Sequence, residues 1–331
     1  NLVNVRYLTG FSGSNAFLAV WPDRSVFVTD ARYGEAAAVL VDGLEDCELV
    51  VYRDDVVAAL AGLFAAEATV DVEADAMTWD MVRRLGEAGR AEPVAVTGTV
   101  EQLRITKDAD EVAALERAAS VGDGAFGALG QLMTAAASES DLGWRLVAEM
   151  RARGAGTALW DPIVASGAHA SIPHYRSGNH PVGTGLLLLD YGCVVEGYHS
   201  DMSRTVWVDG DPPAEMVRIH KAVLDAQEEA LQAVAPGVTA DEVDASARRV
   251  LAGYGYEEQF LHSTGHGVGL QIHEEPWVRR GSETVLQPGH VITVEPGVYL
   301  PGVGGVRIED MVLVDDDPQV LTHASKDMVW T

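Results

Sequence analysis

Two stretches of apolar residues each carry a pair of carboxylates on opposite sides of a turn. In the first stretch, GLLLLDYGCVVEGYHSDMSRTVWV (185–208), Asp190 ends an apolar run and Asp201 follows a turn near residues 195–197. The two arms are expected to pair as an antiparallel hairpin, which places Asp190 roughly opposite Asp201. Carboxylates that face each other repel, so a shared proton or a cation has to compensate them.

The second stretch, HVITVEPGVYLPGVGGVRIEDMVLV (290–314), repeats this arrangement further along the chain. Glu295 ends a run of Val, Ile and Thr, residues 301–305 form a turn, and Glu309 is expected roughly opposite Glu295. Unpaired buried charges are costly, so carboxylates flanked by apolar strand residues predict a shared site rather than separate surface charges. The duplication lies in the placement of the motifs and not in matched letters.

The segment HSTGHGVGLQIHEEP (262–276) adds imidazoles. It holds three of the ten histidines in the chain, and glycines occupy alternate positions from 265 to 269. Glycine inside a strand often marks the close approach of a ligand or of another backbone. The segment is therefore expected to bring imidazoles close to a group that needs room, but the cluster by itself does not identify that group.

One imidazole added to the four carboxylates makes a dinuclear metal site. Four carboxylates carry a charge that two divalent cations balance, and bridging carboxylates hold such ions about 3.5–4 Å apart. An oxygen-rich set with a single nitrogen suits Mn²⁺, Co²⁺ or Fe²⁺, and Zn²⁺ stays open. A thiolate zinc site is excluded, because Cys47 and Cys193 are the only two cysteines.

Length and pattern predict two α/β domains in the 331 residues. The first, residues 1–100, is expected to have strands at 17–21, 25–29, 49–52 and 69–72, and helices at 32–40, 56–66 and 77–88. The second, residues 101–331, is expected to have helices at 108–134, 139–153, 213–235 and 239–253, and strands at 186–195, 198–208, 290–299 and 305–314. Thr239 and Glu242 have the spacing of a capping box.

The chain is acidic, with 50 acidic against 23 basic residues and a net charge of −27 at pH 7. This charge argues against nucleic acid and anionic membranes as partners. No apolar run reaches the length of a transmembrane helix. Two cysteines make no disulfide framework, which favours the cytoplasm. The sequence starts at Asn1 rather than Met, so a targeting segment upstream stays open.

The carboxylates and one histidine resemble the ligand set of a known family. Asp190, Asp201, His266, Glu295 and Glu309 match, in order and spacing, the five ligands of the pita-bread-fold metallopeptidases, which include methionine aminopeptidase, aminopeptidase P and prolidase. Further stretches resemble the proline-specific branch: PIVASGAHASIPHY (162–175), DYGCVVEGYHSDMSRT (190–205), HSTGHGVGLQIHEEP, VEPGVY (294–299) and GGVRIED (304–310). YLTGFSGSNA (7–16) and TDARY (29–33) resemble that branch's smaller, creatinase-like N-terminal domain, which methionine aminopeptidase lacks.

The resemblance implies a role for each ligand. Asp190 would bind one metal ion, His266 and Glu295 would hold the second, and Asp201 and Glu309 would bridge the two. Two divalent ions per chain are implied, with Mn²⁺ the first expectation. The ions would lower the pKa of a water molecule so that it attacks at neutral pH. Glu295 would accept its proton and pass it to the leaving proline nitrogen.

Four further side chains resemble residues that surround the metals in this family. His174, His262 and His273 would bind the substrate and stabilise the tetrahedral intermediate. Arg307 would balance charge or bind a substrate carboxylate, and a structural salt bridge is an equally open role for it. Histidines near a metal can also serve only to orient its ligands.

The implied activity is hydrolysis of the Xaa-Pro bond at the N-terminus of short peptides, by a cytoplasmic homodimer. One position departs from the pattern. Many prolidase-type dipeptidases carry an arginine four residues after the histidine equivalent to His273, and this chain has Trp277 there, with Arg279 and Arg280 nearby. The departure weakens the strict dipeptidase interpretation and leaves longer Xaa-Pro peptides open as substrates.

Two other interpretations differ in function class. A metal-dependent lyase, or a hydrolase of non-peptide amide or C–N bonds, can share the same fold, because fold does not determine function. Creatinase-like members use no metal and lack the ligand set, so the intact five residues argue against that variant. A binding module is the third interpretation, and family members of that kind typically lose ligands.

Overall fold

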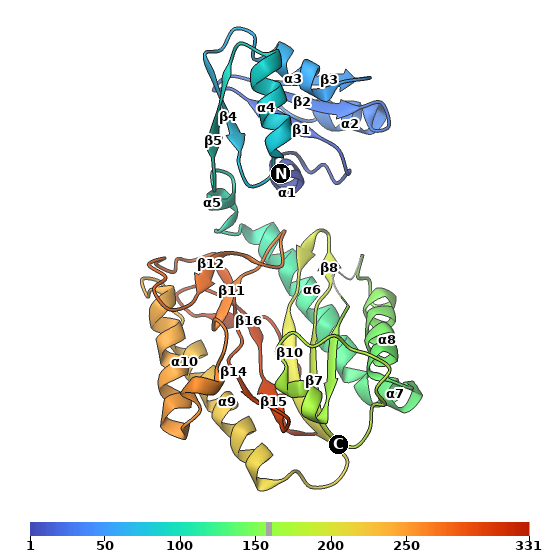
Figure 1. The fold of residues 1–331 in the computed structure, drawn as a ribbon, viewed down its shortest axis with the longest axis vertical. Helices are drawn as coiled ribbons and strands as arrows, with labels where there is room; N and C mark the ends of the chain where they lie inside the picture. The colour runs from blue at the N-terminus through green and yellow to red at the C-terminus, as the bar shows by residue number, and fades with distance from the viewer. Residues whose placement is uncertain (157–160, 331) are drawn as a thin grey trace. The chain divides into compact units, whose positions relative to one another are not determined.

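The computed structural model describes residues 1–156 and 161–330. It divides into two compact units, Asn1–Arg104 and Ile105–Thr331 (Figure 1). No helix in these described ranges is long and apolar enough to cross a membrane.

The first unit is a small α/β domain. Its three-stranded sheet has the order β1-β2-β3, with β1 (Phe17–Val20), β2 (Ser25–Asp30) and β3 (Cys47–Tyr52). A separate parallel pair consists of β4 (Thr69–Glu73) and β5 (Glu92–Val96). The helices are α1 (Leu2–Thr9), α2 (Gly34–Asp42), α3 (Val56–Leu63), α4 (Trp79–Ala88) and α5 (Glu101–Arg104). Every element predicted here is present, whereas α1, β5 and α5 were not predicted.

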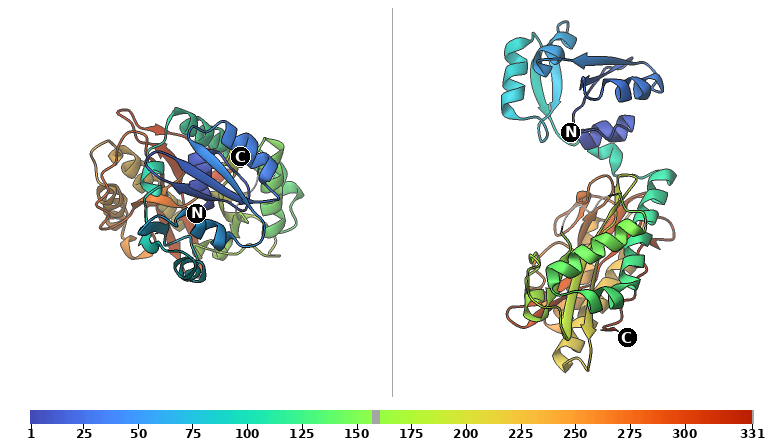
Figure 2. Two further views of the ribbon diagram at one scale, coloured as in Figure 1. Left: turned by 90° about the horizontal axis from the view of Figure 1, so that it is seen from above. Right: turned by 90° about the vertical axis from the view of Figure 1, so that its right-hand side faces the viewer.

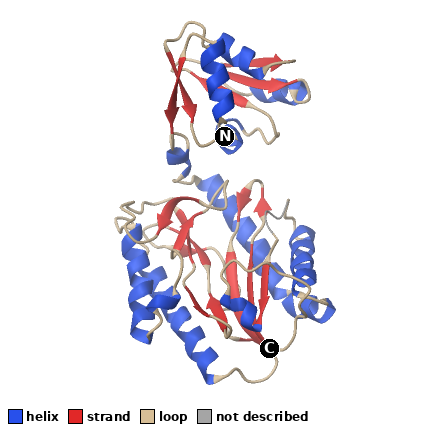
Figure 3. Ribbon diagram, viewed as in Figure 1, coloured by secondary structure: helices blue, strands red, loops and turns tan. Residues whose placement is uncertain are grey.

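Strand β2 organises this unit because both of its faces are buried. Val26 and Val28 pack in one apolar cluster with Val57 of α3, whereas Phe27 points to the opposite face and packs with Ala37 of α2. Alternate side chains of a strand point to opposite faces of the sheet. The helices therefore lie on both sides of β2, as Figure 3 shows.

The second unit carries the carboxylate pairs. Its helices are α6 (Ala109–Gly127), α7 (Leu129–Ala135), α8 (Glu139–Ala152), α9 (Ala214–Ala233) and α10 (Ala240–Tyr254). A four-stranded sheet has the order β18-β10-β7-β6, with β6 (Ile163–Ser166), β7 (Gly185–Tyr191), β10 (Met202–Val208) and β18 (Val329–Trp330). A five-stranded sheet has the order β12-β11-β13-β16-β17, with β11 (Gly265–Gly267), β12 (Glu274–Val278), β13 (Val291–Val294), β16 (Asp310–Leu313) and β17 (Gln319–Val320).

Two short hairpins complete the second unit, and both lie next to the carboxylate pairs. They are β8 (Val194–Val195) with β9 (Tyr198–His199), and β14 (Gly297–Leu300) with β15 (Gly304–Arg307). Two 3₁₀ segments are η1 (Gly167–Ser171) and η2 (Glu257–Gln259).

The apolar run of β7 is explained by helices on both sides of its sheet. Leu186 and Leu188 join the cluster that contains Ile219 of α9, whereas Leu187 joins the cluster that contains Leu146 of α8. A strand buried on both faces reads as a continuous apolar run rather than as an alternating one. Figure 2 shows α7 and α8 covering one side of the strands.

Several long elements predicted from the sequence are divided in the structure. The helix predicted at 108–134 is two helices, α6 and α7, and glycines at 124 and 127 weaken the helix near this break. The strand predicted at 290–299 is interrupted at Glu295 and Pro296, because proline has no N–H to donate to a neighbouring strand. The predicted capping box is confirmed, since Thr239 and Glu242 each bind the other's backbone N–H.

Candidate metal centre

The first carboxylate pair lies on β7 and just before β10, and its predicted register is wrong by two residues. Asp190 pairs with Ser203 and not with Asp201. Glu196 and Gly197 both have positive φ, at 52° and 93°, which makes the connection a tight two-residue turn. Because side chains alternate along a strand, the two-residue shift leaves Asp201 on the same face as Ser203 and diagonal to Asp190.

The second pair has the predicted register. Val294 pairs with Asp310 on one side of the interruption, and Gly297 pairs with Arg307 on the other. The same register therefore places Glu295 opposite Glu309. Glu309 is buried, with 2% of its surface exposed, and Glu295 is partly buried.

His266 reaches the carboxylates from β11, the neighbour of β13. Its backbone N–H donates to Thr293 Oγ1 at 3.1 Å. Its Nε2 lies 3.4 Å from Glu295 Oε1 and 3.7 Å from Asp201 Oδ2. Nδ1 lies 3.0 Å from the carbonyl oxygen of Gly267, and a proton held there leaves the Nε2 lone pair available for a metal.

The glycines beside His266 allow this close approach. A Cβ atom at Gly265 would collide with the carbonyl of Thr293, and one at Gly267 would collide with the carbonyl of Glu275. The alternation seen in the sequence therefore reflects contact with the backbone on both neighbouring strands.

The ligand atoms form three overlapping groups. In each group, one atom from every residue lies within 4.8 Å of the others: Asp190, Asp201 and Glu309; His266, Glu295 and Glu309; and Asp201, His266 and His273. The structure thus brings together all five side chains that the sequence predicted as ligands, and it places His273 beside them.

Burial and mutual repulsion hold protons on this cluster in the chain by itself. Burial, followed by the neighbouring Glu309 carboxylate, raises the pKa of Asp201 and of Glu295 well above their ordinary values. Burial, with Asp190 next, raises the pKa of Glu309 from 4.5 to about 8. Such a set favours a cation that neutralises the carboxylates.

Arg307 provides one positive charge inside the cluster. Its guanidinium donates to Asp190 Oδ2 at 2.5 Å, to the Tyr299 hydroxyl at 2.7 Å and to Ser203 Oγ at 2.9 Å. Only 3% of the Arg307 surface is exposed. Its planar group is therefore held by these three partners and by the carbonyl oxygen of Pro173 at 3.4 Å. Tyr299 and Ser203 are members of the site that the sequence did not reveal.

The other predicted histidines surround the ligands. His262 Nε2 lies 2.8 Å from the Tyr299 hydroxyl, and burial, followed by the charge of Arg307, lowers the pKa of His262 to about 3. Burial also lowers the pKa of His266 to about 3, so both rings are neutral at pH 7. His273 is exposed, and its ring centroid is 4.4 Å from that of His266.

His174 and Trp277 approach the same side of the site. His174 is exposed and lies close enough for its charge to lower the pKa of His262, after burial and Arg307. Trp277 stacks on His273, with ring centroids 6.2 Å apart and an interplanar angle of 23°. The Arg279 guanidinium lies 5.6 Å from the centroid of Trp277 on its ring face.

One oxygen shows directly that the donor set fits a metal. Asp201 Oδ1 is fully buried and has no hydrogen-bond partner among the described residues. A buried polar oxygen without a partner is costly, and a bound cation would satisfy it. Carboxylate oxygens with one imidazole suit divalent ions that prefer oxygen ligands.

Comparison with protein families decides the relationship. Residues 113–316 match metallopeptidase family M24, and residues 1–106 match the creatinase/prolidase N-terminal domain. The chain belongs to the M24 metallopeptidase family. The predicted fold class of this M24 metallopeptidase is confirmed: a small creatinase-like α/β domain is followed by a pita-bread catalytic domain.

Individual relatives of this M24 metallopeptidase cover nearly its whole length. The Xaa-Pro dipeptidase of Pyrococcus furiosus is 33% identical over 319 residues, which are 95% of this chain and 89% of that protein. Among solved structures, a Xaa-Pro dipeptidase from Bacillus anthracis superposes with a TM-score of 0.95 at 35% identity, covering 99% of this chain and 93% of that one. An X-Pro aminopeptidase from Thermotoga maritima has a TM-score of 0.88 at 31% identity, covering 98% and 93%.

Proposed function

We propose that this M24 metallopeptidase is a dinuclear enzyme that hydrolyses the Xaa-Pro bond at the N-terminus of short peptides. The observation that carries the proposal is the convergence of the five predicted ligand side chains in overlapping groups, one of whose members, Asp201, has a buried oxygen with no partner among the described residues. The names of the relatives, Xaa-Pro dipeptidase and X-Pro aminopeptidase, support the substrate class. The resemblance supports a homodimer, and the low cysteine count supports the cytoplasm.

The ligand groups suggest how two ions, with Mn²⁺ the first expectation, would be held. Asp190, Asp201 and Glu309 would surround one ion, and His266, Glu295 and Glu309 the other. When bound, the ions would supply an activated water at neutral pH and neutralise the carboxylates. Arg307, which donates to Asp190, would keep that carboxylate oriented.

Glu295 is the candidate for proton transfer. Its Oε1 lies beside His266 Nε2 and accepts a bond of 3.4 Å from Thr293 Oγ1. Once the ions neutralise the cluster, a carboxylate at this position would accept a proton from water and return it. In this proposal, the proton moves from the attacking water to Glu295 and then to the leaving proline nitrogen.

His262, His273 and His174 are proposed to hold the substrate and the developing oxyanion. The carbonyl oxygen of Ser263, 2.8 Å from His262 Nδ1, can only accept, so the neutral His262 ring carries its proton on Nδ1. Its Nε2 then accepts from the Tyr299 hydroxyl at 2.8 Å, and these two partners fix the orientation of the ring. We expect His262→Ala to lower kcat by about 10²-fold, because it removes the ring that holds the Tyr299 hydroxyl beside Arg307 and so misplaces groups at the site. Metal content should stay unchanged.

Metal analysis and steady-state kinetics would check the His262 prediction. His323→Ala is the matched control, because His323 is exposed and contacts Asp123 only through its backbone N–H. Equal loss of activity in both variants, or loss of metal from His262→Ala, would contradict the proposed role.

The substrate range is tested by offering the Mn²⁺-loaded protein two proline peptides and comparing their cleavage. We expect release of proline from Ala-Pro, or of alanine from Ala-Pro-Ala, and no cleavage of the matched peptides Ala-Ala and Ala-Ala-Ala. Cleavage of the dipeptide alone would assign an Xaa-Pro dipeptidase. Arg279, Arg280 or Arg307 would then replace the missing arginine that binds the carboxylate of the substrate. Cleavage of the tripeptide alone would assign an aminopeptidase, with Trp277 beside the substrate. A metal-loaded protein that cleaves neither proline peptide would refute the proposal.

A further inference from the structure

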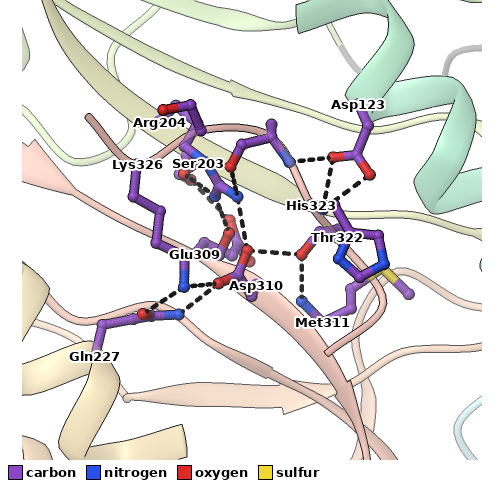
Figure 4. Close-up of polar contacts among 12 residues, drawn as sticks. Asp123, Ser203, Arg204, Gln227, Glu309, Asp310, Met311, Thr322, His323 and Lys326 are labelled. Atoms are coloured by element: carbon purple, nitrogen blue, oxygen red, sulfur yellow. Dashed lines mark hydrogen bonds and ion pairs between the residues drawn. The ribbon is translucent and has the colours of Figure 1, made fainter. Parts of the chain in front are cut away.

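A second buried charge cluster lies behind the proposed ligand Glu309, centred on its neighbour Asp310 (Figure 4). The Asp310 side chain has no exposed surface, and its two oxygens accept four bonds. Oδ1 accepts from Arg204 Nη2 and from Thr322 Oγ1, both at 2.7 Å. Oδ2 accepts from Gln227 Nε2 at 2.8 Å and pairs with Lys326 Nζ at 2.5 Å.

Arg204 links this Asp310 cluster to the strands that carry the ligands. Its Nη1 donates to the carbonyl oxygens of Ser203 at 2.9 Å and of Glu309 at 2.5 Å. Nε and Nη2 donate to the carbonyl oxygen of Ala324 at 3.1 and 2.9 Å, and Nη2 also donates to Asp310. All five N–H groups of the guanidinium therefore have an acceptor, and only 1% of Arg204 is exposed.

The position of Glu309 depends on the two backbones that Arg204 joins. Ser203 Oγ donates to Glu309 Oε2 at 2.7 Å, and the Glu309 N–H donates to the Ser203 carbonyl oxygen at 3.1 Å. Arg204 binds the carbonyl groups of both residues, so its planar fork sets the distance between their strands. A change there would move the Glu309 carboxylate relative to the other ligands.

Residues 321–326 complete the cluster from outside the ligand motifs. This segment contributes Thr322 Oγ1, the Ala324 carbonyl and Lys326 Nζ. Asp123 of α6 fixes it by accepting the backbone N–H groups of His323 and Ala324 at 2.8–2.9 Å. The segment is therefore held by contacts with α6, which carries no predicted ligand.

We propose that the Asp310 cluster, closed by residues 321–326, is a positioning device that sets Glu309 for metal binding. The cluster carries a net positive charge beside the acidic ligands, because it holds two cations, Arg204 and Lys326, and one carboxylate, Asp310. Groups that hold metal ligands in place commonly change metal affinity by about 10–100-fold when they are replaced. The inference rests on the proposed metal centre and extends it to residues that touch no metal.

The experiment measures metal binding and not only activity. Arg204→Lys keeps the charge but cannot join both carbonyls, Asp310 and Ala324 at once. Lys326→Met removes the outer cation, whose side chain is 26% exposed, and Lys326→Arg restores the charge as a rescue variant. Lys221→Met is the matched control, since Lys221 is 64% exposed and pairs with Asp225 on α9.

Calorimetric titration with Mn²⁺ would give the dissociation constants, and the visible absorption of the Co²⁺-loaded protein would report ligand geometry. We expect Arg204→Lys to raise the weaker dissociation constant by about 10–100-fold and to shift the Co²⁺ bands. Lys326→Met should show the same changes in smaller degree. Lys326→Arg should resemble the parent chain because it keeps the cation, and Lys221→Met should do so because a single exposed ion pair contributes little.

Two results would overturn the inference. If Arg204→Lys and Lys326→Met melt at lower temperature but keep the parent's dissociation constants and Co²⁺ spectrum, the cluster only stabilises the fold. If Arg204→Lys does not fold, the comparison of Lys326→Met with Lys221→Met decides. Equal Mn²⁺ affinities of these two variants would then refute the proposal. A parent chain that binds neither metal would refute the proposed function itself, which separates the two failures.

Discussion

Replacing Asp201 by alanine is expected to remove bound metal and to abolish peptide hydrolysis. Asp201 is the one proposed ligand whose buried oxygen has no protein partner among the described residues, so a cation is its expected partner. Metal ions supply several kcal/mol of charge stabilisation in the transition state, which corresponds to about 10³-fold or more in rate. We therefore expect kcat/KM to fall by at least about that factor.

Elemental analysis after gel filtration, together with hydrolysis of Ala-Pro and Ala-Pro-Ala, would measure both effects. Asp201→Asn should behave like Asp201→Ala, because a neutral amide keeps the shape but cannot balance two cations. Asp225→Ala is the control, since Asp225 lies on the surface of α9, paired with Lys221. An Asp201→Ala protein that retains two ions per chain and parental activity would exclude Asp201 as a metal ligand.

The metal-free protein is expected to lose stability as the pH rises from 6.5 to 8. In the folded chain, burial and then Asp190 raise the pKa of Glu309 from 4.5 to about 8, and the pKa values of Asp201 and Glu295 are raised as well. The folded state therefore keeps protons that the unfolded state has already released. The resulting stability is complete below the unfolded pKa and is lost as the pH rises through the folded pKa.

The histidines change stability with pH in the opposite direction, but in a lower pH range. His262 and His266, with pKa values lowered to about 3 mainly by burial, bind protons on unfolding only below the ordinary histidine pKa of 6.5. Between pH 6.5 and 8 the carboxylates therefore dominate. One group contributes about 1.4 kcal/mol per pH unit at most, so we expect a loss on the order of 1–2 kcal/mol.

Thermal unfolding of the chelator-treated protein at several pH values would measure this slope. Mn²⁺ should reverse it, because metal binding requires deprotonated ligands and strengthens with pH. Glu309→Gln should flatten the slope of the metal-free protein. A metal-free melting temperature that rises steadily from pH 6.5 to 8 would show that the carboxylates do not share protons as the structure indicates.

The sequence predicted which side chains converge better than it predicted the geometry that joins them. The correct register of Glu295 and Glu309 followed from the alternation around them and from the turn between them. This worked because the same register continues across the interruption at Glu295 and Pro296. The register of Asp190 was wrong by two residues, because the turn was placed at 195–197 and the structure has a two-residue turn at Glu196 and Gly197.

Short or glycine-rich elements were harder to predict. Strand β11 has the sequence GHG, which carries no alternation of apolar and polar residues, yet it places His266 between two neighbouring strands. Strand β5 contains Pro93, which lowers the expectation of a strand. These elements form because tertiary pairing satisfies their backbone groups, and a local pattern does not record such pairing.

The Asp310 cluster shows a different limit of sequence reasoning. Arg204 and Asp310 both lie inside quoted motifs, but their partners Gln227 and Lys326 come from segments with no distinctive pattern. In an acidic chain, a lone lysine or glutamine reads as a surface residue. Their role appears only when the fold brings the 321–326 segment against β10 and β16.

The order of the proposed ligands along the chain has a consequence for biosynthesis. Asp190 and Asp201 precede α9 and α10, whereas His266, Glu295 and Glu309 follow them. A chain that is still being translated therefore holds only two acidic ligands for the time needed to make both helices. The full set exists only after Glu309 has emerged, so metal loading has to follow nearly complete translation of this domain. Nascent chains stalled before β16 should be unable to retain the metal.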